Sequence, residues 1–193
     1  WRYEPREAGD TSVVGWCVMA LKSGSMGNLA VPRNTFLKAN EFLDFVSVNQ
    51  GAYYGYDKPT SNIDGRHATT AVGLLCRMYM GYSKEHPGIK AGVEYLSKTG
   101  PRTNDLYYSY YATQVLRHYG GPEWENWNRK MRDGLIAKQV NEGHALGSWP
   151  TGGPHSDHGG RLNNTSLACM ILEVYYRHMP LYSEKFSDED FEL

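Results

Sequence analysis

Residues Thr69–Arg77 read Thr-Thr-Ala-Val-Gly-Leu-Leu-Cys-Arg, and three other segments resemble them, at residues 11–19, 109–116 and 165–172. Each segment is apolar on nearly all sides, which is typical of a fully buried helix. A small residue recurs at one register, with spacings of 58, 39 and 57 residues: Gly15, Gly73, Ala112 and Cys169. Such spacings indicate a weak internal repeat of supersecondary units. We interpret the small residue as a packing feature that lets a neighbouring helix approach closely.

Amphipathic segments alternate with these buried ones. Residues 35–48, 87–98 and 124–140 each place apolar side chains along one stripe and most charged side chains off it. No part of the chain shows sustained period-two alternation, so no sheet is expected, although Tyr53-Tyr54-Gly55-Tyr56 suits a short extended piece. The sequence therefore predicts an all-α fold of about seven helices, arranged as helical hairpins with buried helices inside and amphipathic helices outside.

Composition and charge exclude several classes of protein. Lys and Arg number 20 against 21 Asp and Glu, a net charge of −1, which disfavours a nucleic-acid protein that binds through a basic face. The longest apolar run, Val13–Leu21, is too short to span a membrane. A hydrophobic content of 40% rules out wholesale disorder. Three cysteines are too few, and odd in number, for a disulfide framework.

Two long glycine-rich loops, at residues 51–66 and 141–161, join the expected helices. Loops of this size in a compact domain are usually functional or mobile. Residues 184–193 are expected to form an acidic tail, which leaves residues 1–183 as one repeat domain.

A distinctive joint follows the third amphipathic segment. Its end, Leu135-Ile136-Ala137-Lys138-Gln139, is followed by Gly143 and then by Gly147-Ser148-Trp149. A helix-terminal Gln followed by a Gly-x-Trp turn resembles the QW repeat of squalene and terpene cyclases, in which the Gln ties the helix end to the turn and the Trp covers it. Gln50-Gly51 with Gly55-Tyr56 looks like a degenerate copy, and Trp1-Arg2-Tyr3 looks like the back end of another.

From Trp1 to Tyr182 the chain resembles bacterial proteins with prenyltransferase and squalene-oxidase repeats, which belong to the α/α-toroid superfamily. The resemblance implies a ring of helix pairs around a central cavity. A closed ring of six pairs needs on the order of 300 residues. We therefore expect a toroid-like arc or a reduced ring, and expect this domain to be the C-terminal part of a longer chain.

The catalytic motifs of the superfamily are missing from the sequence. It contains no Asp-x-Asp-Asp, the motif that protonates an alkene in cyclases, and no Cys has an Asp two residues before it, as the zinc site of protein prenyltransferases requires. Cyclisation and zinc-dependent prenyl transfer are both disfavoured, and no cofactor is expected. The favoured interpretation is a non-catalytic binding or scaffolding domain with an aromatic-lined cavity.

A second hypothesis is an isoprenoid diphosphate-utilising enzyme with a diverged site. Arg66 and Arg161 each follow a Gly shortly before a buried segment, where a helix N-terminus attracts anions. The resemblance also implies a diphosphate site, since a Gly-Arg pair is part of that site in prenyltransferase β subunits. The alternative is that each Arg braces its loop or pairs with Asp64.

Further candidates for a ligand site are polar groups at helix starts and aromatic rings. Asp10, Asp105 and Asn164 precede buried segments, so N-capping explains them, although a cap can also form the rim of a cavity. Trp16, Tyr107 and Tyr108 are candidates for the cavity wall, which suits an apolar chain, an isoprenoid, a sugar or a peptide. Adjacent helical positions point about 100° apart, so not every tyrosine can face the cavity.

A third hypothesis is a carbohydrate-active (α/α)-barrel protein, a class that uses two carboxylates across its cavity when it is a hydrolase. Asp64, Asp105 and Asp157 are the plausible suppliers. His155, Asp157 and His158 have a spacing compatible with a metal site. A Gly/His loop of this kind is more often simply solvated, so no metal is expected.

Overall fold

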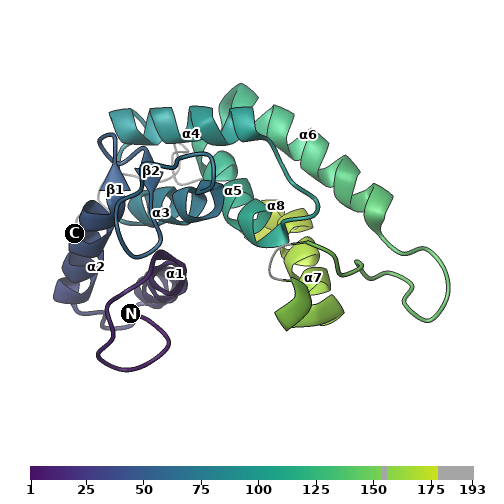
Figure 1. The fold of residues 1–193 in the computed structure, drawn as a ribbon, viewed down its shortest axis with the longest axis horizontal. Coiled ribbons are helices and arrows are strands. Elements are labelled where there is room, and N and C mark those ends of the chain that lie inside the picture. The colour runs from purple at the N-terminus through teal and green to yellow at the C-terminus, as the bar shows by residue number, and fades with distance from the viewer. Residues whose placement is uncertain (154–155, 178–193) are drawn as a thin grey trace.

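The computed structural model describes residues 1–153 and 156–177 of the 193-residue chain. Its described residues form an all-α fold, as predicted (Figure 1). The helices are α1 (Thr11–Met26), α2 (Arg33–Val46), α3 (His67–Tyr79), α4 (Pro87–Thr99), α5 (Leu106–Tyr119), α6 (Gly121–Lys138), α7 (Ser156–Leu172) and the single turn α8 (Val174–Arg177). The predicted acidic tail, residues 184–193, lies outside the described residues.

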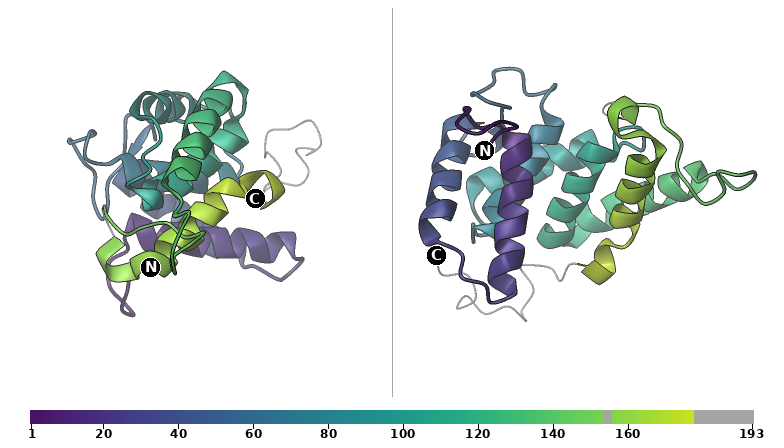
Figure 2. Two further views of the ribbon diagram at one scale, coloured as in Figure 1. Left: turned by 90° about the vertical axis from the view of Figure 1, so that its right-hand side faces the viewer. Right: turned by 90° about the horizontal axis from the view of Figure 1, so that it is seen from below.

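The helices form two layers along an arc. In the inner layer α3 packs between α1 and α5, and α7 packs on the other side of α5. Helices α2, α4 and α6 pack on α1, α3 and α5 respectively, which makes three successive hairpins (Figures 1 and 2). The predicted burial is confirmed for the inner helices α3 and α5. For α1 and α7 the prediction of full burial is wrong, because each packs against an inner neighbour on one side only within the described residues. Helices α1 and α7 run roughly parallel on the inner side of the arc (Figure 2).

One short hairpin interrupts the helical pattern. Strand β1 (Ser47–Val48) pairs with β2 (Tyr53–Tyr54) in antiparallel register, and Asn49 and Gln50 adopt positive φ in the turn. The extended piece predicted at Tyr53-Tyr54 is confirmed. Its partner strand was not predicted, because two residues are too few to show a period-two pattern.

The recurring small residues behave differently from one helix to the next. A Cβ on Gly15 would lie 2.4 Å from Cγ1 of Val72 on α3, so the predicted close helix approach is confirmed there. A Cβ on Gly73 would lie 2.3 Å from Cγ of Tyr54, so a ring rather than a helix occupies that space. Cys169 is exposed, and at this position the packing interpretation is wrong.

A buried charge ties the first hairpin to the second. Arg77 on α3 is 2% exposed, and its Nη2 lies 2.5 Å from Asp44 Oδ1 on α2. Its Nε donates to the Tyr54 hydroxyl at 3.2 Å, and its Nη1 donates to the Tyr82 hydroxyl at 3.1 Å. A buried guanidinium needs such partners to offset its desolvation. Burial raises the pKa of Tyr54 to about 12, although Arg77 opposes the shift.

Two of the three residues predicted as N-caps form the expected hydrogen bond. Asp10 accepts from the Val13 amide and Asp105 accepts from the Tyr108 amide, so both predicted N-caps are confirmed. Asn164 is not a cap, because α7 begins eight residues earlier at Ser156 and continues through a kink at Gly160 (φ 63°). Its Nδ2 instead donates to the Pro150 carbonyl at 2.8 Å.

The Gln–Trp joint after α6 has the predicted geometry. Gln139 Nε2 donates to the Gly147 carbonyl at 2.9 Å and so ties the helix end to the turn. Trp149 is 5% exposed, and its Nε1 donates to the Leu135 carbonyl in the last turn of α6 at 2.9 Å. The indole is a second donor to the Leu135 carbonyl, which also accepts from the Gln139 amide at 3.1 Å.

Among the described helices, none combines the length and the apolar character needed to cross a membrane.

Candidate functional site

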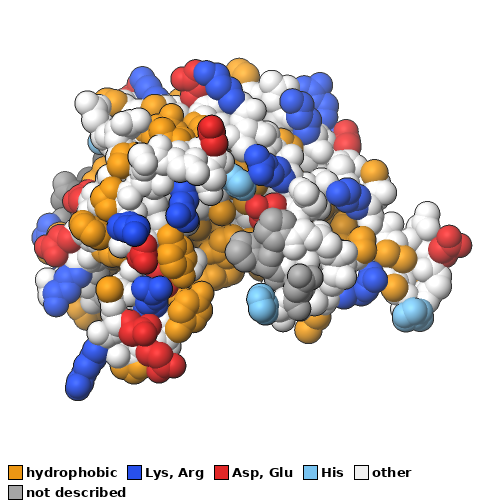
Figure 3. Space-filling model, viewed as in Figure 1, with side chains coloured by type: hydrophobic (Ala, Val, Ile, Leu, Met, Phe, Trp, Pro, Cys, Tyr) orange, Lys and Arg blue, Asp and Glu red, His pale blue; other side chains and the backbone are white. Residues whose placement is uncertain are grey.

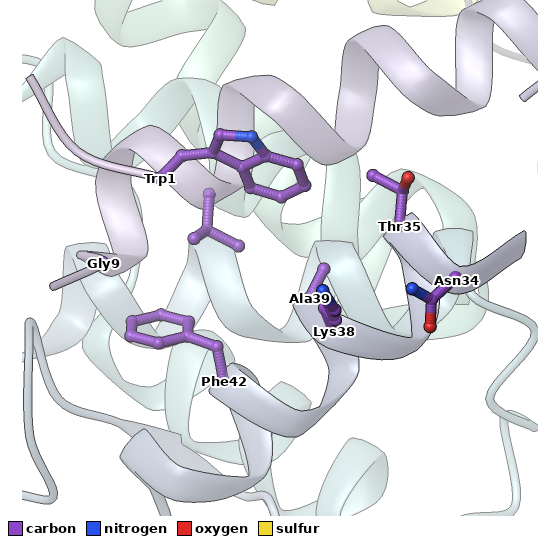
Figure 4. Close-up of a pocket in the computed structure, with 8 residues that line it drawn as sticks. Trp1, Gly9, Asn34, Thr35, Lys38, Ala39 and Phe42 are labelled. Carbon is purple, nitrogen blue, oxygen red and sulfur yellow. The ribbon is translucent and has the colours of Figure 1, made fainter. Parts of the chain in front are cut away.

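Two of the cavities that border the described helices bear on the predicted site, and one of these two lies within the row of inner helices. The other, of about 410 Å³, lies on the flank, where the rings of Trp1 from the N-terminal segment and Phe42 from α2 border it (Figure 4). None of the residues predicted for a ligand, anion or metal site lines this outer cavity. We therefore take the inner cavity as the candidate site.

The inner cavity, of about 110 Å³, is formed by α1, α5 and α7, and we call it the aromatic pocket. Its lining residues are Trp16, Asn104, Leu106, Tyr107, Asn163, Asn164, Leu167 and Met170. Figure 3 shows hydrophobic side chains gathered in a notch of the surface between the parts that cover α1 and α7. Two residues predicted for a cavity wall, Trp16 and Tyr107, are thus brought together here.

Trp16 is held against α5 from one side only. Its ring stacks on Tyr110 at 5.7 Å with an interplanar angle of 19°, and meets Tyr111 edge-on at 5.6 Å. Both tyrosines are buried, whereas Trp16 is 44% exposed. Aromatic pairs of this kind contribute roughly 0.5–1.5 kcal/mol beyond area burial. The indole is therefore fixed in orientation while part of its surface faces solvent.

Tyr107 forms a second aromatic wall with a hydroxyl that stays neutral. Its ring meets Tyr111 edge-on at 5.2 Å. Burial raises the pKa of Tyr107 well above its usual range, although hydrogen bonding to Tyr111 and Ser12 opposes part of the shift. Ser12 in turn donates to Asp10, which is fully buried. Asp10 thus supports the pocket from behind through Ser12, and is not among the lining residues.

Asparagine amides supply the polar part of the lining. Asn104 is exposed and Asn163 is half-buried, whereas Asn164 is 7% exposed and its Nδ2 is already bonded to Pro150. The loop after α6 crosses directly over the start of α5, where a Cβ on Gly153 would lie 1.8 Å from the Asn104 carbonyl oxygen. Only glycine permits that approach, so the loop fixes the rim of the pocket beside Asn104.

The two arginines predicted to bind an anion do not meet at the aromatic pocket. Arg66 is exposed at the N-cap position of α3 and makes no side-chain capping bond. Arg161 lies just after the kink in α7, and its Nη1 donates to Ser148 Oγ at 3.0 Å, which braces the loop. Neither side chain lines the aromatic pocket or the outer cavity. Within the described residues no ion pair joins Arg66 to the exposed Asp64.

Asp105 and Tyr108 lie at the junction of α3 and α5. Asp105 Oδ2 lies 3.3 Å from His67 Nε2, and the His67 ring meets the Tyr108 ring edge-on at 4.7 Å. Tyr108 is fully buried and donates to the Gly100 carbonyl at 3.1 Å. These groups tie two inner helices together. Asp64 and Asp105 line neither the aromatic pocket nor the outer cavity, and the side chain of Asp157 lies outside the described residues.

The described residues contain no group of three or more His, Cys, Asp or Glu side chains that could hold a metal ion. His158 is exposed, while His155 and the side chain of Asp157 fall outside the described part of the chain.

Sequence reasoning missed five lining residues: Asn104, Leu106, Asn163, Leu167 and Met170. Asn163 was missed because the sequence analysis starts the last buried helix after Asn164 and treats Asn164 as its N-cap. Starting that helix earlier, at the Gly-Gly-Arg sequence, would have placed Asn163 and Met170 seven residues apart on one helix face. Nothing in the sequence marked Asn104 as a lining residue except its position next to the predicted N-cap Asp105.

Comparison of the chain with protein-family models, with curated proteins and with solved structures finds no match in any of the three. The resemblance to the α/α-toroid superfamily therefore stays a prediction.

Proposed function

We propose that this chain is a non-catalytic binding domain, and that its ligand occupies the aromatic pocket between α1, α5 and α7. The observation that carries the proposal is the state of Trp16, which is 44% exposed yet stacked on a buried tyrosine. An exposed ring of this size, held at the wall of a pocket, is a typical anchor for a ligand because contact removes a large apolar area from water at little cost in side-chain entropy.

The chemistry of the lining favours binding over catalysis. As far as residues 1–153 and 156–177 define it, the pocket is lined by four apolar or sulfur-containing side chains, three amides and one tyrosine, with no charged group. Acid–base or nucleophilic catalysis needs a group with a pKa suited to proton transfer or attack. The raised pKa of Tyr107 instead keeps its hydroxyl protonated, so it acts as a hydrogen-bonding group.

A ligand screen by two-dimensional ¹⁵N–¹H NMR tests the proposal on the intact chain. The panel consists of an uncharged pentapeptide, methyl α-glucoside, farnesol and farnesyl diphosphate, which represent the ligand classes that an aromatic cavity suits. We expect one class to shift the Trp16 indole N–H resonance in a saturable manner. The Trp16→Ala variant should lose that binding while its remaining spectrum keeps the native dispersion.

Trp1→Ala is the matched control, because Trp1 is similarly exposed, at 45%, but borders the outer cavity. It should bind the same ligand with unchanged affinity. Binding that survives Trp16→Ala, or that is lost in Trp1→Ala, contradicts the proposed site. Turnover of farnesyl diphosphate by the purified protein contradicts the non-catalytic assignment.

A further inference from the structure

We infer that the ligand of the aromatic pocket is an extended, uncharged peptide segment that inserts one apolar side chain between α1 and α7; this inference rests on the function proposed above. The pocket would take an aliphatic side chain, and the amides at its edge would take the flanking peptide groups.

The size of the pocket sets the first limit on its occupant. An apolar cavity of about 150 Å³ is large enough to bind benzene. At about 110 Å³ the aromatic pocket is smaller, so it can enclose one aliphatic side chain but not a polyisoprenoid tail. The inner wall matches such a side chain, because Leu106, Leu167 and Met170 are apolar and the thioether adapts to irregular shapes.

The amides set the second limit. Asn104, beside the start of α5, and Asn163, on α7, lie on different elements of the lining, and neither side chain makes a hydrogen bond within the described residues. An Asn side chain offers one carbonyl acceptor and two N–H donors, which match the N–H and C=O groups of a peptide. Those backbone groups are available in an extended segment, whereas a helix already pairs them internally. The concave side of an arc of helical hairpins is the surface on which such proteins bind extended partners.

The apolar inner wall of the pocket argues against an enclosed sugar. A pyranose enclosed in this pocket would bring several hydroxyls against Leu106, Leu167 and Met170, where they would find no partner. Each buried and unpaired hydroxyl costs on the order of 1–3 kcal/mol. An aliphatic side chain has no such groups, and its peptide bonds stay at the edge where the amides lie.

Acetyl-Ser-Gly-Leu-Gly-Ser-amide, titrated into the ¹⁵N-labelled intact chain, is the direct probe. We expect saturable shifts of the Trp16 indole and the Asn163 side-chain amide, with a dissociation constant of about 1 mM for so small a ligand. The same peptide with Asp in place of Leu should bind at least about tenfold more weakly, because its charge would enter an uncharged pocket. N-methylation of the two bonds flanking Leu should weaken binding about fivefold.

Asn163→Ala should weaken the Leu peptide by about fivefold and should remove the effect of N-methylation. Asn128→Ala is the matched control, since Asn128 is also half-buried but lies on the outer helix α6, and it should leave the affinity unchanged. Equal binding of the Leu and Asp peptides, or an unchanged affinity in Asn163→Ala, overturns the peptide assignment.

The peptide inference and the proposed function fail in different ways. If methyl α-glucoside or farnesol shifts the Trp16 indole saturably and the Leu peptide does not, the pocket is a binding site but its ligand is not a peptide. If no member of the panel shifts the Trp16 indole, both the inference and the proposed site are wrong.

Discussion

Helices α3 and α7 carry the same degenerate motif but occupy opposite environments. In α3 every residue from Thr70 to Tyr79 is buried, because α1 covers one side and α5 the other. In the described part of α7, Leu162 is 80% exposed, and Ser166 and Cys169 are exposed too. The comparison shows that the motif encodes a helix suited to burial, whereas the number of neighbouring helices decides how much of it is buried.

The polar side chains of the two helices differ in the same way: on α3 they bond to other parts of the protein, whereas on α7 one is open to a ligand. On α3, Arg77 has partners on α2, on β2 and at Tyr82, and so contributes to the packing of the first two hairpins. On α7, Asn163 faces a pocket with its amide unused by the described residues. The α3 environment is therefore expected to control stability, and the α7 environment to control binding.

Replacing the small residue of each motif by Val gives the sharpest contrast. In Gly73→Val the new side chain would collide with the buried Tyr54 ring, and we expect a loss of about 3 kcal/mol in the free energy of unfolding. Cys169→Val, at the same register of α7, should change it by less than about 0.5 kcal/mol because the position is exposed. Urea denaturation of both variants is the measurement, and equal losses would contradict the comparison.

The two arginines of these helices give the next largest difference. Arg77→Met keeps the apolar stem but leaves the buried Tyr54 hydroxyl without its donor, so we expect a loss of about 2 kcal/mol. Arg161→Met removes one exposed hydrogen bond to Ser148 and should cost less than about 0.5 kcal/mol. Thermal unfolding followed by circular dichroism distinguishes them. An Arg77→Met protein as stable as the parent would show that the buried cluster adds nothing to packing.

Variants at Gln139 and Trp149 test whether the joint between α6 and α7 holds α7 in place. Trp149→Phe keeps an aromatic ring but removes the indole N–H, which is one of two donors to the Leu135 carbonyl, and the expected loss is about 1 kcal/mol. Gln139→Ala removes an exposed hydrogen bond and should cost about half as much. Hydrogen exchange of α6 and α7 amides should report both changes as faster local opening. Faster exchange confined to α2 and α3 would contradict this role of the joint.

Alkaline pH should lower the free energy of unfolding, because Cys76 of α3 and the neighbouring Tyr54 are buried in their protonated forms. Burial raises the pKa of the Cys76 thiol and of Tyr54 to about 12 each. The unfolded chain loses these protons first, so stability is complete below about pH 8.5 and falls as the pH rises toward 12. We expect a loss of about 2 kcal/mol at pH 10, measured by urea denaturation.

Cys76→Ala should shift the onset of that loss upward, from about pH 8.5 toward about pH 10, where tyrosine remains as the titrating group. Cys169→Ala, at an exposed position of α7, is the control for the removal of a thiol. A profile that is flat from pH 8 to pH 10.5 in the parent protein would contradict the buried state of Cys76.

The layered arrangement could be predicted because hydrophobic periodicity depends on burial, and burial differs strongly between inner and outer helices. The N-caps Asp10 and Asp105 were predictable for a local reason, since each contact spans three residues. The Gln139–Trp149 joint, whose indole bond spans 14 residues, was expected only from its resemblance to a known repeat. The pocket was only half predictable. Trp16 and Tyr107 are recognisable as aromatic candidates, but their meeting with Asn163 depends on how α1, α5 and α7 pack over long sequence separations.

The most direct test of the account is the measurement of intermolecular nuclear Overhauser effects between acetyl-Ser-Gly-Leu-Gly-Ser-amide and the ¹³C,¹⁵N-labelled chain. The account predicts contacts from the peptide Leu methyl groups to the indole ring of Trp16 and the methyl group of Met170, which border the aromatic pocket from α1 and α7. Contacts to Trp1 and Phe42 in the outer cavity, with none to Trp16, would contradict it.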